Sequence, residues 1–171
     1  FVLLSIWRRL DQSIFFARLF SVILAPLTVW AVAAAARRLL PGISALLVAA
    51  VSCVHFQIIW GAVEIRPYAL MVLLSCLILI TFYDGFIESE RRSVSRVLFV
   101  IVCLAALYTQ YYLGFLMAGC GLSLLVANRR AIPSFAVCTA VITALFLPMA
   151  YAVTSQLSAV TGQTESVFGG L

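Results

Sequence analysis

The sequence predicts an all-α protein, a polytopic bundle of about six transmembrane helices, two of them short. Composition is the first reason: 65% of the 171 residues are hydrophobic and 10% are charged, whereas about a quarter of the residues in soluble domains are charged. The second reason is that six apolar stretches follow one another with little sequence between them. Apolar runs of this length are typical of helices that cross a membrane.

The six stretches set the expected organisation of the chain. The predicted spans are residues 15–36, 43–63, 67–83, 97–109, 111–127 and 131–151. We expect an extracytoplasmic interfacial segment at 1–14, a transmembrane domain at 15–153 and the start of an extracytoplasmic loop at 154–171. Residue 1 is Phe and no signal peptide precedes the first apolar run, so the remainder of a longer polypeptide is an expected partner.

Arginine placement predicts the topology. All eleven basic residues are Arg, and seven of them lie between or beside spans. These seven are Arg37 and Arg38, then Arg91, Arg92 and Arg96, then Arg129 and Arg130. Positive residues near span ends favour the cytoplasmic side, so an even number of crossings should separate successive clusters.

The stretch between the last two clusters must therefore cross twice. Residues 97–128 would form a single helix of about 48 Å, well beyond a hydrocarbon core of about 30 Å. A break near Thr109-Gln110-Tyr111-Tyr112 divides this stretch into two short helices. The segment 84–96 is then expected to be a cytoplasmic loop, with its charges solvated or near anionic lipid heads.

This topology puts several arginines on the non-cytoplasmic side, against the usual trend. Arg8 and Arg9 follow Trp7 in an amphipathic opening and are expected to lie near lipid heads. Arg18 and Arg66 fall on the same side at the ends of spans. Arginines that oppose the trend are the ones for which a functional reason is expected.

The stretch EIRPY (64–68) carries the main candidate site. Pro67 suits the first turn of a helix and favours an extended conformation at Arg66. Alternate residues of an extended segment point the same way, so Glu64 and Arg66 should face one space together. An arginine oriented by a carboxylate can hold a phosphate through two parallel hydrogen bonds, and Tyr68 adds a hydroxyl. The alternative is an interfacial ion pair that closes a hairpin, with Tyr68 as a membrane anchor.

Four segments resemble, in order, the polytopic GT-C glycosyltransferases, which include protein O-mannosyltransferases and lipid A aminoarabinose transferases. EIRPYAL (64–70) resembles the family signature E-x-R-x-Y-A-L. FARLFS (16–21) resembles the R-L-x-S start of the second membrane helix. LYTQYYLG (107–114) resembles the T-H-Y-x-G segment, with Gln110 where histidine is common. LFLPMAYAVTSQ (145–156) resembles the helix that leads to an extracytoplasmic loop.

The resemblance implies inverting transfer of a sugar from a polyprenyl-phosphate donor to an acceptor on the non-cytoplasmic side. It implies a plasma-membrane location, here in a bacterium, with the site on the periplasmic or extracellular side. The family's base is an acidic residue in the first extracytoplasmic loop, which would precede Phe1. The catalytic residue is thus unknown in this sequence, and Asp11, only seven residues before Arg18, is not assigned to it.

Three further residues are expected to bind substrate. Arg18 can contact the leaving phosphate, or it can be an interface arginine that extends to the lipid heads. Gln110 and Tyr111 can bond sugar or phosphate, or they can satisfy backbone groups at the helix break.

Other chemistry has weaker support. His55 is a lone intramembrane histidine. A hydrogen bond to a neighbouring helix is a simpler role for it than proton relay. The five cysteines lie in apolar runs without C-x-x-C spacing and are expected to be small core residues. No metal ligand set and no cofactor site is expected, and the partners are membrane lipids and the donor, not nucleic acid.

Two rival functions remain open. One is a transporter or flippase subunit for a lipid-linked or anionic substrate, which needs helices broken near the midplane. The other is a structural subunit.

Overall fold

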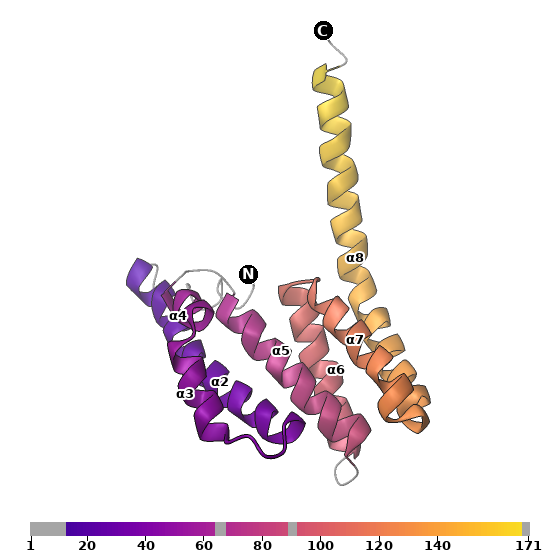
Figure 1. Cartoon of the computed structure of the whole chain (residues 1–171). Coiled ribbons are helices and arrows are strands. Elements are labelled where there is room, and N and C mark those ends of the chain that lie inside the picture. Colours follow the sequence, from indigo (N-terminus) through magenta and orange to yellow (C-terminus); the bar gives the residue numbers. More distant parts are fainter. Residues whose placement is uncertain (1–12, 64–67, 89–91, 169–171) are drawn as a thin grey trace.

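The computed structural model describes residues 13–63, 68–88 and 92–168, all of them in helices or short connections (Figure 1). The predicted all-α class is confirmed. The α-helices of the described residues are α2 (Ile14–Leu39), α3 (Ala45–Val54), α4 (Phe56–Val63), α5 (Tyr68–Phe82), α6 (Arg92–Thr109), α7 (Leu113–Ala127) and α8 (Ile132–Phe168). A π-helical turn, Tyr83–Ile87, extends α5, and a short 3-10 helix, Arg129–Ala131, precedes α8.

Three helical segments are long and apolar enough to cross a membrane, as in an integral membrane protein. They are Arg18–Leu39, Tyr68–Ile87 and Arg129–Met149. Three shorter apolar helices accompany them: Ala45–Val54, Ser93–Thr109 and Leu113–Ala127. The last two are the short pair that the sequence predicts, and the first arises from a break that it does not predict.

That break divides the predicted span 43–63, so the prediction of one continuous helix there is wrong. α3 ends at Val54, His55 has φ −71° and ψ 122°, and α4 begins at Phe56. The backbone at the break is partly satisfied locally, because His55 N–H donates to the carbonyl of Ser52 and its own carbonyl accepts from two residues of α4. Neither Pro nor Gly stands near His55, so the usual sequence signal of a helix break is missing.

The break expected at Thr109–Tyr112 is confirmed. α6 ends at Thr109, a turn follows, and α7 begins at Leu113. Gln110 N–H still donates to a carbonyl of α6 while the Gln110 carbonyl accepts from Leu113 N–H, at 2.7 and 3.1 Å. The two short helices therefore run in opposite directions, as the topology requires.

Two predicted loops are shorter than expected. In the segment 84–96, residues up to Ile87 continue the helix as a π-turn and α6 already begins at Arg92. The expected loop from residue 154 onward is helical as far as Phe168, and Figure 1 shows α8 reaching well past the ends of the other helices. Pro148 lies inside α8 without ending it, because one proline removes only one backbone donor from a long helix.

The arginine clusters meet at one end of the bundle, here named the arginine end, around the π-turn. Arg38 Nε of α2 lies 2.8 Å from Asp84 Oδ1. Arg96 Nε donates to the carbonyl of Gly85 at 3.1 Å, and Asn128 Nδ2 donates to the carbonyl of Phe86 at 2.8 Å. Side chains from three separate parts of the chain are thus bonded to three consecutive residues, Asp84 to Phe86. The described arginines of all three clusters share one end, as the topology predicts.

Four phenylalanine rings pack directly beneath this polar layer. Phe86 is 1% exposed, and its ring centroid lies 5.3 Å from those of Phe99 and Phe135, both in edge-on contact. Phe82 completes the group at 5.7 to 6.3 Å from the other three. The Arg96 guanidinium carbon lies 5.4 Å from the Phe86 ring centroid, which adds a cation–π contact. These rings begin a core that continues along α5, α6 and α7.

A glycine lets α7 pack closely against this cluster. A Cβ added at Gly121 would lie 2.8 Å from the Phe135 ring, whereas one at Gly119 would have nothing within 4 Å. We therefore expect Gly121→Ala to lower the free energy of unfolding by about 1–3 kcal/mol through overpacking. Gly119→Ala on the same helix should be neutral or stabilising by up to about 1 kcal/mol. Denaturation of both variants in mixed micelles measures the difference, and equal stabilities would contradict the packing argument.

Candidate functional site at the outer end

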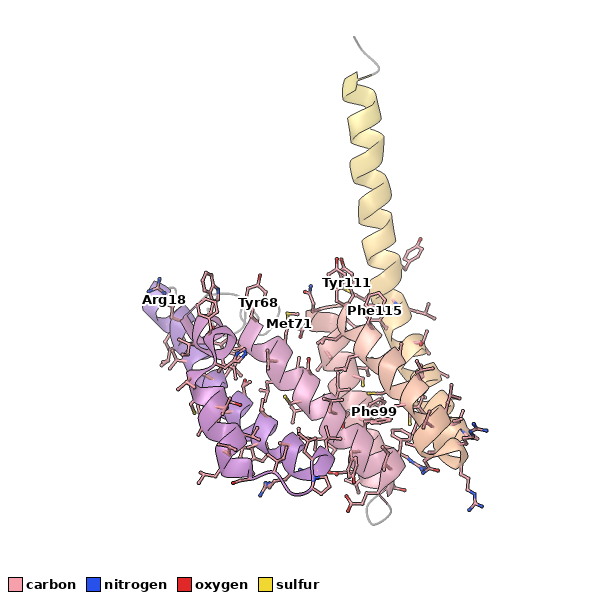
Figure 2. All side chains as sticks on the ribbon, viewed as in Figure 1. Arg18, Tyr68, Met71, Phe99, Tyr111 and Phe115 are labelled. Carbon is pink, nitrogen blue, oxygen red and sulfur yellow. The ribbon has the colours of Figure 1, made fainter. Side chains whose placement is uncertain are left out.

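The predicted site residues gather at the end opposite the arginine end, here named the outer end. α2 and α5 both run toward the arginine end, so Arg18 and Tyr68, near their starts, lie at the outer end. α6 runs the other way and delivers Gln110 and Tyr111 to the same end. Figure 2 shows Arg18, Tyr68 and Tyr111 along one edge of the molecule. Residues from three separate parts of the sequence are thereby brought to one end.

Glu64 and Arg66 lie outside the described residues. The described parts on either side are α4, which runs to Val63, and α5, which runs from Tyr68. Their shared orientation toward one space, and the role of Pro67 in producing it, therefore stay predictions from the sequence.

The start of α5 is bonded to α2, which carries Arg18. Thr28 of α2 is buried, and its hydroxyl oxygen lies 2.8 Å from the carbonyl of Leu24 and 3.3 Å from that of Ala69. Ala69 directly follows Tyr68, so this contact places the Tyr68 backbone against α2. The Arg18 and Tyr68 side chains are both exposed, and both can reach a molecule that approaches from the outer end.

The turn between α6 and α7 presents two phenols in tilted contact. The ring centroids of Tyr111 and Tyr112 are 4.2 Å apart, and both side chains are more than half exposed. A hydrogen bond with the neighbouring Tyr112 phenol stabilises the neutral form of Tyr111 and raises its pKa, so Tyr111 stays a neutral hydroxyl at physiological pH. Gln110 is half-buried beside them. The turn thus offers hydroxyl and amide groups for hydrogen bonding.

Tyr108 fixes α8 next to this turn. Its hydroxyl donates to the carbonyl of Leu145 at 3.1 Å, and its ring makes an edge-on contact with Phe146 at 5.7 Å. The stretch of α8 that resembles the family's proline-containing helix therefore lies beside the turn that resembles its T-H-Y-x-G segment. The sequence does not indicate this bond, because exposed tyrosines near span ends are also ordinary membrane anchors.

The described outer end can bind an anion or a polyol, but its described side chains include no general base. Asp84 and Glu88, whose carboxylates the structure describes, both lie at the arginine end. Within 13–63, 68–88 and 92–168, no three His, Cys, Asp or Glu side chains are placed to hold a metal ion. The described predicted site residues supply one guanidinium, two phenols and an amide to this end.

The remaining sequence candidates lie elsewhere. His55 is exposed at the break between α3 and α4, away from the turn at Gln110. Cys103 and Cys120 are buried, which confirms them as small core residues, and Cys76 and Cys138 are half-buried. Cys53 is exposed, so the prediction of a core position is wrong for that residue. The residue pair that sequence reasoning missed is Arg38 and Asp84, which are 46 positions apart. The one sequence signal for Arg38 or for Asp84 is that each is a charged residue at the edge of an apolar run.

No protein-family model, no curated protein and no solved structure matches this chain.

Proposed function

We propose that this chain is part of an inverting GT-C-type glycosyltransferase that moves a sugar from a polyprenyl-phosphate donor to an acceptor on the non-cytoplasmic side of a bacterial plasma membrane. One observation carries the proposal. Arg18, Tyr68, Gln110 and Tyr111 fall in three separate motif-like segments, and all four lie at the end of the bundle opposite the arginine clusters. Unrelated anchoring residues would have no reason to follow the order and placement of one family's motifs.

The chemistry assigns these groups to the leaving phosphate and the sugar. As the anomeric C–O bond breaks, negative charge grows on the polyprenyl phosphate, and positive donors at the outer end stabilise it. Arg66, oriented by Glu64, is the first such donor in the proposal and Arg18 is the second. Tyr68, Gln110 and Tyr111 hydrogen-bond phosphate or sugar hydroxyls. The acceptor oxygen attacks from the opposite face, and a base outside the described residues takes its proton.

The test is release of carrier phosphate by the complete gene product. The protein, reconstituted in vesicles, is incubated with undecaprenyl-phosphate mannose, glucose or aminoarabinose and with a membrane extract as the source of acceptor. The expected result is release of undecaprenyl phosphate from at least one donor, coupled to labelled acceptor. Absence of release from all three, with the protein folded by its denaturation profile, would overturn the proposal.

The break at His55 favours a second candidate, a transporter or flippase subunit for a lipid-linked substrate. Ten residues of α3 precede His55 and eight of α4 follow it, so an apolar span is interrupted near its middle. Transporters commonly bind substrate at helices interrupted near the midplane. The same vesicles separate the candidates, since transport moves the intact donor between leaflets without releasing undecaprenyl phosphate.

A further inference from the structure

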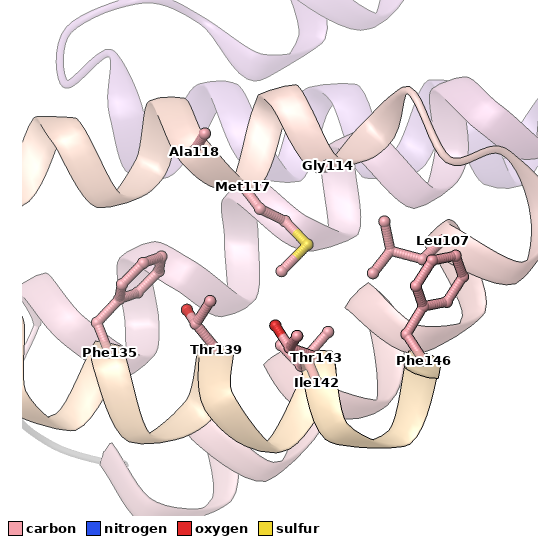
Figure 3. Close-up of a pocket in the computed structure, with 9 residues that line it drawn as sticks. All are labelled: Leu107, Gly114, Met117, Ala118, Phe135, Thr139, Ile142, Thr143 and Phe146. Carbon is pink, nitrogen blue, oxygen red and sulfur yellow. The ribbon is translucent and has the colours of Figure 1, made fainter. Parts of the chain in front are cut away.

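A cavity of about 270 Å³ lies between α6, α7 and α8, and none of its lining residues is a group assigned to sugar transfer. Figure 3 shows the space between α7 and α8, with Met117 projecting into it from one helix and Thr139 and Thr143 from the other. The remaining lining is apolar except for the backbone of Gly114. A space of this size within a packed bundle requires an occupant or costs stability.

Both ends of the cavity are closed by close packing. Toward the arginine end, α7 and α8 meet where the Phe135 ring lies against Gly121, too close for any side chain there. Toward the outer end, Leu107 and Phe146 close the space, and Phe146 is itself held against Tyr108. The side between α7 and α8, where the lining includes exposed residues, is therefore the more open route into the cavity.

The side opening faces the hydrocarbon region. Ala118 and Thr143 line the cavity and are also exposed on the surface. Thr139 is the middle residue of the apolar segment Arg129–Met149, so the cavity lies near the depth of the bilayer centre. The surface around the opening is apolar, with Leu122 and Leu147 both exposed, and is continuous with the face that α7 and α8 present to lipid.

The lining is mostly apolar and offers a polar occupant few hydrogen-bond partners. Thr139 Oγ1 is buried and has no hydrogen-bond partner within the described part of the chain. An ordered water needs two to four polar partners, and apolar cavities of roughly 150 Å³ stay dry and bind apolar molecules. Met117 adds a flexible, polarisable surface that adapts to an irregular apolar shape.

We infer that this cavity binds one acyl chain of a bilayer phospholipid, inserted sideways between α7 and α8. The head group stays with the neighbouring lipids, and the end of the chain fills the space around Met117 and Thr139. Such a lipid keeps α7 and α8 apart on the arginine-end side of the Tyr108 contact. The inference is independent of sugar transfer and holds for either candidate function.

The test uses a phosphatidylethanolamine with a photoreactive diazirine near the end of one acyl chain. The complete protein is reconstituted in vesicles with increasing fractions of this lipid, irradiated and mapped by peptide mass spectrometry. We expect labelling near Met117 and Thr139 that saturates. Labelling near Val126, which is 92% exposed to bulk lipid, should rise in proportion to the probe.

Matched variants and a competitor separate the explanations. Ala118→Trp fills the opening and should lower the saturable labelling about tenfold, while Ala144→Trp, on the face of α8 away from the cavity, should leave it within about twofold of wild type. Thr139→Val keeps the shape of the side chain and removes its hydroxyl, so the saturable labelling should stay the same or rise. The inference would be overturned if Thr139→Val lost the labelling or if the labelling did not saturate. It would also be overturned if a few undecaprenyl phosphates per protein displaced the probe, because the cavity would then belong to the carrier.

Discussion

Phe86→Ala is expected to lower the free energy of unfolding by about 3–5 kcal/mol, the range for removing a fully buried aromatic side chain. Phe86 is 1% exposed and touches the rings of three other phenylalanines. Its loss leaves a cavity beneath the π-turn and removes the ring on which the Arg96 guanidinium rests. The side chains around it come from three helices, α5, α6 and α8, so no single helix can move to fill the space.

Phe115→Ala provides the matched control. Phe115 is 77% exposed on α7, and a side chain that faces lipid or detergent loses little when it is shortened. Denaturation in mixed micelles, followed by circular dichroism, should show a large loss for Phe86→Ala and a change within about 0.5 kcal/mol for the control. Similar losses for both variants would show that the phenylalanine cluster is not the stability centre of the bundle.

Arg66→Lys is expected to lower sugar transfer by the complete protein about 100-fold or more, as removal of a preorganised donor to a developing anion typically does. Lysine keeps the charge but cannot supply the two parallel hydrogen bonds that a guanidinium gives to phosphate. Release of undecaprenyl phosphate measures the effect. This expectation rests on the sequence of the segment 64–68. The last residue of that segment, Tyr68, lies at the outer end of the structure.

Arg130→Lys is the control, because Arg130 is exposed at the arginine end. Its transfer rate should stay near that of wild type, and both variants should match wild type in denaturation. Transfer by Arg66→Lys that equals the control would remove Arg66 from the proposed role and leave Arg18 as the leading phosphate donor.

Span length and charge explain why much of the fold is predictable from sequence. The turn at Gln110 follows from arithmetic, since residues 97–128 are too many for one crossing and the arginine clusters must share a side. The shared placement of Arg18, Tyr68 and Tyr111 follows from the same argument. These predictions depend on hydrophobicity and helix direction, which local sequence specifies.

The features that the sequence does not predict depend on tertiary contacts. The break at His55 lacks Pro and Gly, so nothing local distinguishes it from a continuous helix. The π-turn at Tyr83–Ile87 closes with a bond from Glu88 N–H to the Tyr83 carbonyl, and two of its other carbonyls accept from Arg96 and Asn128, which are distant in sequence from it. Of the candidate site, sequence predicts the side on which residues lie but not their distances, because four helices separate Arg18 from Gln110.

The convergence of polar bonds on the π-turn has a consequence for biosynthesis. Asp84 cannot meet Arg38 until the chain through residue 87 has left the ribosome and entered the bilayer, so α2 and α5 must first be retained as neighbours by their apolar faces. The carbonyls of Gly85 and Phe86 then become acceptors for Arg96 and, later, Asn128 as each following helix is inserted. The three bonds therefore become available in the order in which the chain is synthesised.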